Sequence, residues 1–153
     1  MQSVPPPARI HRRLVDSLYV EAMLLADDAR AYFDGEGREQ RDALDAVMRV
    51  SFSCEALKVT TRLMHVIAWL LTQRAVDTGE LAAHEAATPA RRLGSAPLPE
   101  MAVLAAMPAR AVALVEASRA LYERVERLDA VFDEPAPASS PAHRMINRLR
   151  GAL

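Results

Sequence analysis

The stretch SCEALKVTTRLMHVIAWLLTQRAVDTG, residues 53–79, decides the fold class of this chain. It contains no Pro, and its only Gly is the last residue. At about 100° per residue, a helix with this sequence carries apolar side chains over roughly half of its circumference. Such a wide face indicates a helix that packs against two neighbours. We therefore predict an all-α, antiparallel three-helix bundle with this long central helix, and we expect Leu63, Ile67, Leu70 and Leu71 to be buried.

Polar side chains form a narrower stripe on the same helix, and Trp69, the only Trp of the chain, lies among them. Arg62 and His65 belong to this stripe. Two interpretations of Trp69 stay open. Its ring lies flat over the bundle and is buried, or it anchors an interface with a partner, a role in which Trp is enriched. Arg62, His65 and Trp69 are therefore candidate partner-binding residues.

Composition limits the class and the compartment. A chain of 153 residues can bury the core of one domain, and its β-branched and aromatic residues are too few for a sheet protein. The single cysteine, Cys54, excludes an internal disulfide, favours a reducing compartment and is expected to be a small buried hydrophobe. There is no apolar run of about 18 residues and no apolar segment of a signal peptide at the start. We expect a cytoplasmic protein without a membrane span.

The charges are distributed unevenly along the chain. All 20 acidic residues lie between Asp16 and Glu134, whereas arginines are the only charged residues (Asp, Glu, Lys or Arg) in the segments before and after this range. Nucleic-acid binding needs a concentrated positive face, which an acidic body with short basic ends does not provide. We therefore expect no nucleic-acid partner.

Pro and Gly divide the chain into elements. A first helix is expected from about residue 8 to Asp34, with Gly35 in the left-handed position that ends many helices. A second is expected from about residue 38 to 78, and a third from Pro108 to about residue 133. Along the second helix, apolar and small residues recur at heptad spacing. These nine residues, called the heptad stripe below, are Val47, Val50, Cys54, Leu57, Thr61, Met64, Ala68, Leu71 and Ala75.

The remaining segments are less regular. Pro and Gly within residues 80–108 predict an irregular connector before the third helix. Residues 135–141 are rich in Pro and Ser, as in a mobile linker. We divide the chain into a bundle domain, 8–134, and a flexible tail, 135–153, made of this linker and a short amphipathic peptide. That peptide is too short to hold a helix alone and is expected to dock in a groove. Its candidate partner-binding residues are Arg144, Met145, Ile146, Arg148, Leu149 and Leu153.

Catalytic and metal-binding patterns are missing from the sequence. The four histidines are scattered, and no Glu-x-x-His pair suggests a metal site in the bundle. There is no Gly-rich phosphate loop and no G-x-S-x-G motif. The polar residues on the expected helix seams are only Cys54, Thr61 and Ser118, small residues that cores commonly tolerate. We expect no catalytic residue, no metal and no cofactor.

Several segments together resemble a known family. These are SCEALKVTTRLMHVIAWLLTQRAVDTGEL (53–81), RRLG (91–94), LYERVERLD (121–129) and LYVEAMLLADDARAYFDG (18–35). They are similar to the family catalogued as domain of unknown function 1465, the family of the bacterial regulator of CtrA degradation. The gap-free block TTRLMHVIAWLLTQRAV (60–76) is the most specific part of the resemblance.

The resemblance implies a three-helix bundle that dimerises and performs no chemistry. It also implies a cell-cycle adaptor that helps deliver substrates to the ClpXP protease, with ClpX and a response regulator as partners and a flexible C-terminal tail. For the homodimer we expect contact through the first and second helices, with Trp69 at or near it. The alternative is a helical-bundle interaction or structural protein with an unrelated regulatory role; an enzyme of the bundle class is a third interpretation.

Overall fold

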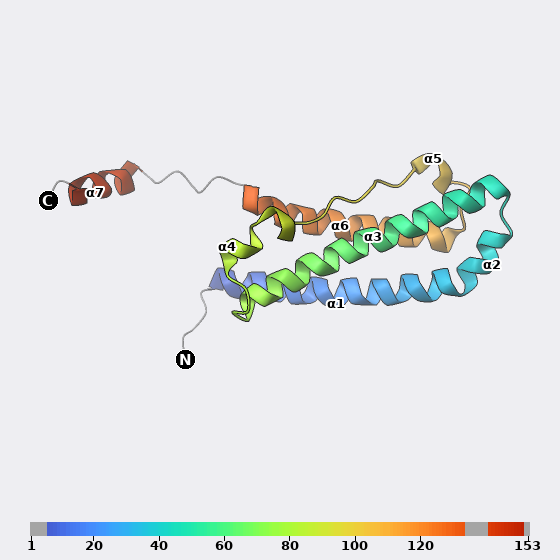
Figure 1. Cartoon of the computed structure of the whole chain (residues 1–153), viewed down its shortest axis with the longest axis horizontal. Helices are drawn as coiled ribbons and strands as arrows, with labels where there is room; N and C mark the ends of the chain where they lie inside the picture. The colour runs from blue at the N-terminus through green and yellow to red at the C-terminus, as the bar shows by residue number, and fades with distance from the viewer. Residues whose placement is uncertain (1–5, 134–140, 152–153) are drawn as a thin grey trace.

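The computed structural model describes residues 6–133 and 141–151, and within these residues there is no β-strand. Three long helices make the body of the molecule: α1 (Pro6–Asp34), α3 (Ala46–Asp77) and α6 (Ala109–Asp129) (Figure 1). The shorter elements are α2 (Glu36–Asp42), α4 (Ala83–Ala86), η1 (Pro89–Arg91), α5 (Met101–Leu104), η2 (Ala130–Asp133) and α7 (Pro141–Gly151). The predicted all-α bundle is confirmed.

The relative direction of the long helices differs from a fully antiparallel bundle. Arg12 at the start of α1 contacts the backbone oxygen of Asp77 at the end of α3, so these two helices are antiparallel. In contrast, α3 and α6 run in the same direction, because Arg62 bonds Ser118 and, two turns later, Trp69 bonds Asp129. Residues 78–108 make this possible, since they return along the length of the bundle before α6 begins (Figure 1).

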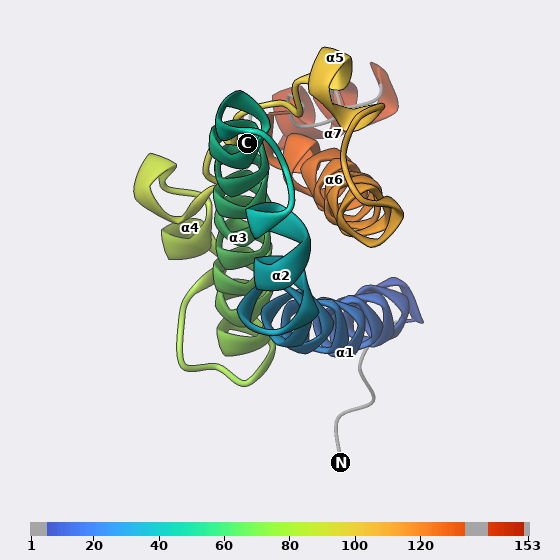
Figure 2. The ribbon, with the colours of Figure 1, turned by 90° about the vertical axis from the view of Figure 1, so that its right-hand side faces the viewer.

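The second predicted helix is divided in two. We expected one helix over about 38–78, but α2 ends at Asp42 and α3 begins at Ala46. Asp45 has an extended backbone, and its side chain accepts a hydrogen bond of 2.9 Å from the backbone N–H of Met48. Aspartate in this position caps an exposed helix N-terminus and favours a new start over continuation. Figure 2 shows α2 leaving the axis of α3 at this point.

The expected left-handed conformation at Gly35 is wrong. Gly35 has φ of −112°, and the only positive-φ glycine in the described residues is Gly79, with φ of 80°. Glycine at position 35 has a steric reason instead, since a Cβ there would lie 2.8 Å from the backbone oxygen of Ala31. Gly79, by contrast, ends α3 with the backbone freedom that glycine supplies.

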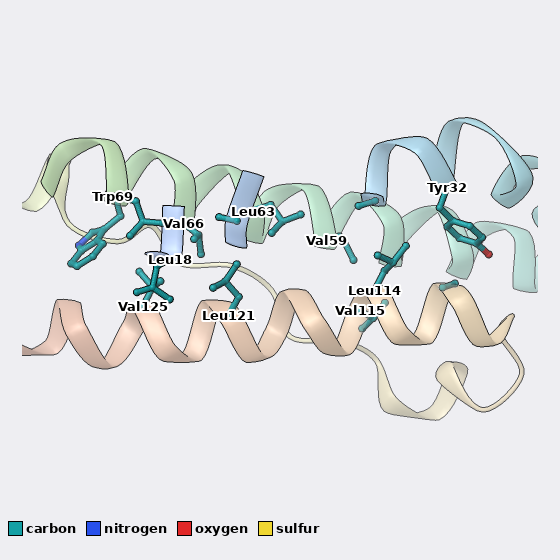
Figure 3. Close-up of a cluster of buried hydrophobic side chains, with 14 of the residues drawn as sticks. Leu18, Tyr32, Val59, Leu63, Val66, Trp69, Leu114, Val115, Leu121 and Val125 are labelled. Atoms are coloured by element: carbon teal, nitrogen blue, oxygen red, sulfur yellow. The ribbon is translucent and has the colours of Figure 1, made fainter. Parts of the chain in front are cut away.

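The core lies between the three long helices (Figure 3). Leu63 and Leu70 of α3 are buried as predicted, and Ile67 is partly buried. The prediction that Leu71 is buried is wrong, because 47% of its surface is exposed. Figure 3 shows Leu121 and Val125 of α6 pointing toward α3, and both are buried. No helix of the described residues is long and apolar enough to cross a membrane.

Candidate interaction surfaces

The heptad stripe lies on the outside of the bundle. The exposed fractions of its large residues are 75% for Val47, 64% for Val50, 67% for Leu57, 64% for Met64 and 47% for Leu71. Successive residues of this stripe are three and four positions apart, so they share one face of α3. This face is opposite the buried positions Val59, Val66 and Gln73, which contact the bundle. α3 therefore has two apolar faces, of which only one is covered by α1 and α6.

Cys54 belongs to the exposed face. We expected a small buried hydrophobe, but this free cysteine is exposed. The expectation failed because the helix has apolar residues on two sides, and Cys54 is on the side away from the core. With Val50 and Leu57 it lines a shallow hollow of about 540 Å³, bordered by Arg41 and Arg49.

Trp69 lies inside the molecule. Its exposed fraction is 2%, and its indole N–H donates a hydrogen bond of 2.9 Å to Oδ1 of Asp129. The same carboxylate accepts from Nε of Arg92 at 2.8 Å and from the backbone N–H of Leu93 at 3.3 Å. The hydrogen bonds of Trp69, Arg92 and Leu93 to Asp129 thus join α3, α6 and the connector, and we call these four residues the buried clamp. Placing Trp69 at a partner contact was wrong.

Arg62 is also buried, with an exposed fraction of 2%. It donates to the hydroxyl of Ser118 at 3.1 Å and to the backbone oxygen of Pro97 at 3.2 Å. Burial lowers the pKa of the guanidinium, and the nearby Glu55 carboxylate opposes that shift. Because its donors are used inside the chain, Arg62 anchors the connector, and its predicted place on a partner surface is wrong.

Of the three candidate partner-binding residues on this helix, His65 is the one that is not buried. It lines a pocket of about 310 Å³ together with Trp69, Thr72 and Arg91. Its Nδ1 is buried without a hydrogen-bond partner in the described residues, and Gly94 packs on the ring so closely that a Cβ would lie 2.8 Å from this nitrogen. The close packing accounts for glycine at position 94.

The C-terminal candidates are helical in part. Residues 141–151 form α7, where a disordered peptide was expected. Met145, Ile146 and Leu149 expose 68%, 47% and 63% of their surfaces, and Arg148 is exposed as well. Residues 135–140, which are most of the predicted linker, lie outside the described residues, as do Leu153 and the side chain of Arg144. The apolar side of α7 is a second surface available to a partner.

Sequence reasoning found the heptad stripe but did not assign it to the outside. The spacing was visible, whereas the side facing the bundle could be known only after α1 and α6 were placed. The buried clamp at Asp129 was missed entirely. Its sequence signal was weak, because Arg92 and Asp129 are 37 positions apart. In the described residues, no group of three or more His, Cys, Asp or Glu side chains is arranged to hold a metal ion.

These features define a class of protein: an all-α bundle whose connector is held to α3 and α6 by hydrogen bonds and whose central helix has an apolar outer face. The family model described as "Protein of unknown function (DUF1465)" matches residues 7–153, and the chain belongs to that family. A similar solved structure is the crystal structure of RcdA from Caulobacter crescentus CB15. It has 34% sequence identity and a TM-score of 0.64, and the match covers 78% of this chain and 90% of that chain. No curated protein matches the chain.

Proposed function

We propose that this protein is a non-enzymatic, homodimeric adaptor that helps deliver protein substrates to the ClpXP protease in cell-cycle control. The observation that carries the proposal is the pair of apolar surfaces available to partners, the heptad stripe and the exposed side of α7. Large contiguous apolar surfaces on a protein mark interaction sites. Membership of the DUF1465 family and the similarity to RcdA support the adaptor role over other interaction roles.

The heptad stripe is the surface we assign to the homodimer. Our expectation of a contact near Trp69 moves to the opposite side of α3, because Trp69 is buried and Leu57 and Met64 are exposed. A two-fold interface uses the same patch on both copies, and an apolar stripe at heptad spacing fits another copy of itself. The exposed side of α7 then stays free to bind ClpX, the response regulator that works with it, or a substrate.

The homodimer is tested with one charged substitution and a matched control. Leu57→Glu changes a heptad-stripe residue that is 67% exposed, and Leu24→Glu changes a residue of α1 that is 65% exposed. Neither change buries a charge in the single chain, so both variants should fold. Light scattering after size exclusion should give about twice 16.8 kDa for wild type and Leu24→Glu, and 16.8 kDa for Leu57→Glu. A monomeric wild type at micromolar concentration would contradict the homodimer.

The adaptor role is tested by reconstitution. Purified protein, ClpXP and response regulator are mixed with candidate substrates captured from the native host and identified by mass spectrometry. We expect this chain to increase the rate at which a captured substrate is degraded and to have no effect on an unrelated ClpXP substrate. If the chain binds other host proteins and changes no degradation rate, the alternative of a regulatory interaction protein replaces the adaptor.

A further inference from the structure

We propose that the 310 Å³ pocket between α3 and the connector binds a carboxylate side chain in an acidic peptide segment of a partner protein, with His65 and Arg91 as its hydrogen-bond donors. The pocket is lined by α3 and by residues of the connector between positions 90 and 94. Ala68 is the one residue that its lining shares with the heptad stripe, and none of its lining belongs to α7. The site therefore requires neither the homodimer nor delivery to ClpXP.

The imidazole of His65 offers one nitrogen to a ligand in this pocket. Its Nδ1 is buried against Gly94 and has no hydrogen-bond partner in the described residues. A buried N–H without an acceptor is costly, so the neutral ring carries its proton on Nε2. Nε2 forms no hydrogen bond within residues 6–133 and 141–151 and, unlike Nδ1, is not fully buried. It is therefore the donor that a ligand can reach.

Arg91 supplies the free positive charge of the pocket. It is exposed, and it forms no ion pair within the described part of the chain. The neighbouring Arg92 also lines the pocket, but its guanidinium is already bonded to Asp129 and Asp133. One uncompensated cation beside a neutral donor matches a ligand group with a single negative charge. Hydrogen bonds between a guanidinium and a carboxylate are among the strong ones.

The rest of the lining favours a carboxylate on an aliphatic stem over a phosphate. Ala68, Ala90 and the indole of Trp69 contribute apolar surface, which suits the methylene groups of a Glu or Asp side chain. The hydroxyl of Thr72 already donates to the backbone oxygen of Ala68, so few donors remain for the several oxygens of a phosphate. Asp129 lies close behind the pocket, bonded to the indole of Trp69, and its charge repels a dianion more than a single carboxylate.

The walls of the pocket are held in place by bonds within the chain. Trp69 and Arg92 both bond Asp129 in the buried clamp, and Gly94 packs closely on the ring of His65. A site whose walls are already ordered loses less conformational entropy when a ligand binds. The pocket can thus accept an acidic side chain without rearrangement of the bundle.

Trp69 fluorescence tests the site, because this residue lines the pocket and is the only Trp of the chain. The probe is a capped tetrapeptide with two glutamates, and the matched peptide carries two glutamines; both are titrated at equal ionic strength. We expect a saturable change in emission with the glutamate peptide and none with the glutamine peptide. Arg91→Gln should weaken binding by about tenfold, since a hydrogen bond between charged groups is lost.

The matched control is Arg38→Gln, which removes an exposed charge on α2 at the other end of the bundle (Figure 1). It should change the affinity less than about twofold, because screening weakens the effect of distant surface charges. Equal weakening by Arg91→Gln and Arg38→Gln would reduce the binding to general charge attraction and overturn the site. Equal responses to the two peptides would overturn it as well.

Nitrogen-15 NMR of the imidazole tests the role of His65 separately. Signals that disappear in His65→Leu are assigned to this ring. At about pH 8 they should show the proton on Nε2, and the glutamate peptide should shift Nε2 more than Nδ1. Tighter binding of inorganic phosphate than of the glutamate peptide would overturn the carboxylate assignment. If neither Trp69 nor His65 responds to the peptide, the inference is wrong and the proposed adaptor role is unaffected.

Discussion

At the scale of single residues, the carboxylate of Asp129 has the largest number of partners. It accepts from Trp69, Arg92 and Leu93, and Arg92 donates in addition to Asp133 at 3.0 Å. These hydrogen bonds raise the pKa of the Arg92 guanidinium, with those from Asp129 contributing most. A few polar atoms therefore join α3, α6 and the connector. Their hydrogen bonds fix the relative orientation of these segments, which non-directional apolar contacts alone would not do.

Removing the Asp129 carboxylate, which accepts all the hydrogen bonds of the clamp, should destabilise the folded protein strongly. Asp129→Ala leaves the indole N–H of Trp69 and the guanidinium of Arg92 without their acceptor. We expect the free energy of unfolding to fall by about 3 kcal/mol, because breaking one side of a buried pair leaves the other uncompensated. Urea denaturation followed by Trp69 fluorescence measures this. Glu123→Ala, which removes an exposed ion pair with Arg119, is the control and should cost less than about 1 kcal/mol.

A tyrosine next to the clamp predicts a pH dependence. The hydroxyl of Tyr122 donates to the backbone oxygen of Gly94 at 2.7 Å. Burial raises the pKa of this phenol above its ordinary value of about 10, and Glu126 raises it further. A raised pKa in the folded state means that the stabilisation is complete below about pH 10 and is lost as the pH rises through the folded value.

Tyr122→Phe should therefore lower the free energy of unfolding by about 1 kcal/mol at pH 8, since it removes one hydrogen bond. Above about pH 10 the difference between wild type and Tyr122→Phe should shrink, because the phenolate cannot donate and its burial is costly. Urea denaturation at both pH values measures the two differences. Equal differences at the two values would exclude a role for ionisation of Tyr122.

At the scale of elements, α3 shows how one helix serves two surfaces. Leu70 is fully buried, and its neighbour Leu71 is 47% exposed on the heptad stripe. A step of about 100° along a helix is enough to move from one face toward the other. The same residue type at adjacent positions thus has a core role in one case and a surface role in the other.

This contrast gives a matched pair of substitutions. Leu70→Ala should lower the free energy of unfolding by about 2–5 kcal/mol, because it removes buried methyl groups and leaves a cavity. Leu71→Ala should cost less than about 1 kcal/mol in the single chain. Both are measured by urea denaturation in the Leu57→Glu background, so that dimer dissociation does not contribute. A small effect at Leu70 would place that residue outside the core.

The start of α3 is decided by one local contact within a favourable helical sequence. Residues 38–78 contain no Pro and no Gly, so composition alone favours a continuous helix. The Asp45 side chain instead bonds the backbone N–H of Met48 and begins a new helix at Ala46. A capping aspartate inside a long helical segment is therefore informative, and this signal was available in the sequence.

At the scale of the whole molecule, the connector fixes the direction of α6. It is attached along its length by two buried side chains of α3: Arg62 donates to the backbone oxygen of Pro97, and Glu55 accepts from the backbone N–H of Glu100 at 2.9 Å. Because these anchors lie on α3, the connector follows that helix back toward its beginning. α6 then starts beside the N-terminal half of α3 and runs parallel to it.

The C-terminal segment should be separable from the bundle. Deleting residues 135–153 should leave the melting temperature and the dimer mass nearly unchanged, because the apolar residues of α7 are exposed rather than packed in the core. Capture of a substrate or of a ClpXP component should weaken. Met145→Ser with Leu149→Ser, in the full chain, tests whether the apolar side is responsible. An unfolded truncation would make the segment structural, and unchanged capture would exclude the recognition role.

The sequence alone determined the helical class, the extents of α1 and α6 to within a few residues and the repeat of the heptad stripe, because all three follow from local spacing and from Pro and Gly. Only the tertiary structure decided that the stripe faces outward, that Trp69 and Arg62 are buried, and that α6 runs parallel to α3. The physical reason is that periodicity records that a helix face is apolar without recording what covers it. The partners of Trp69 and Arg62 lie far along the chain, at Asp129 and Ser118, and become neighbours only when the helices pack.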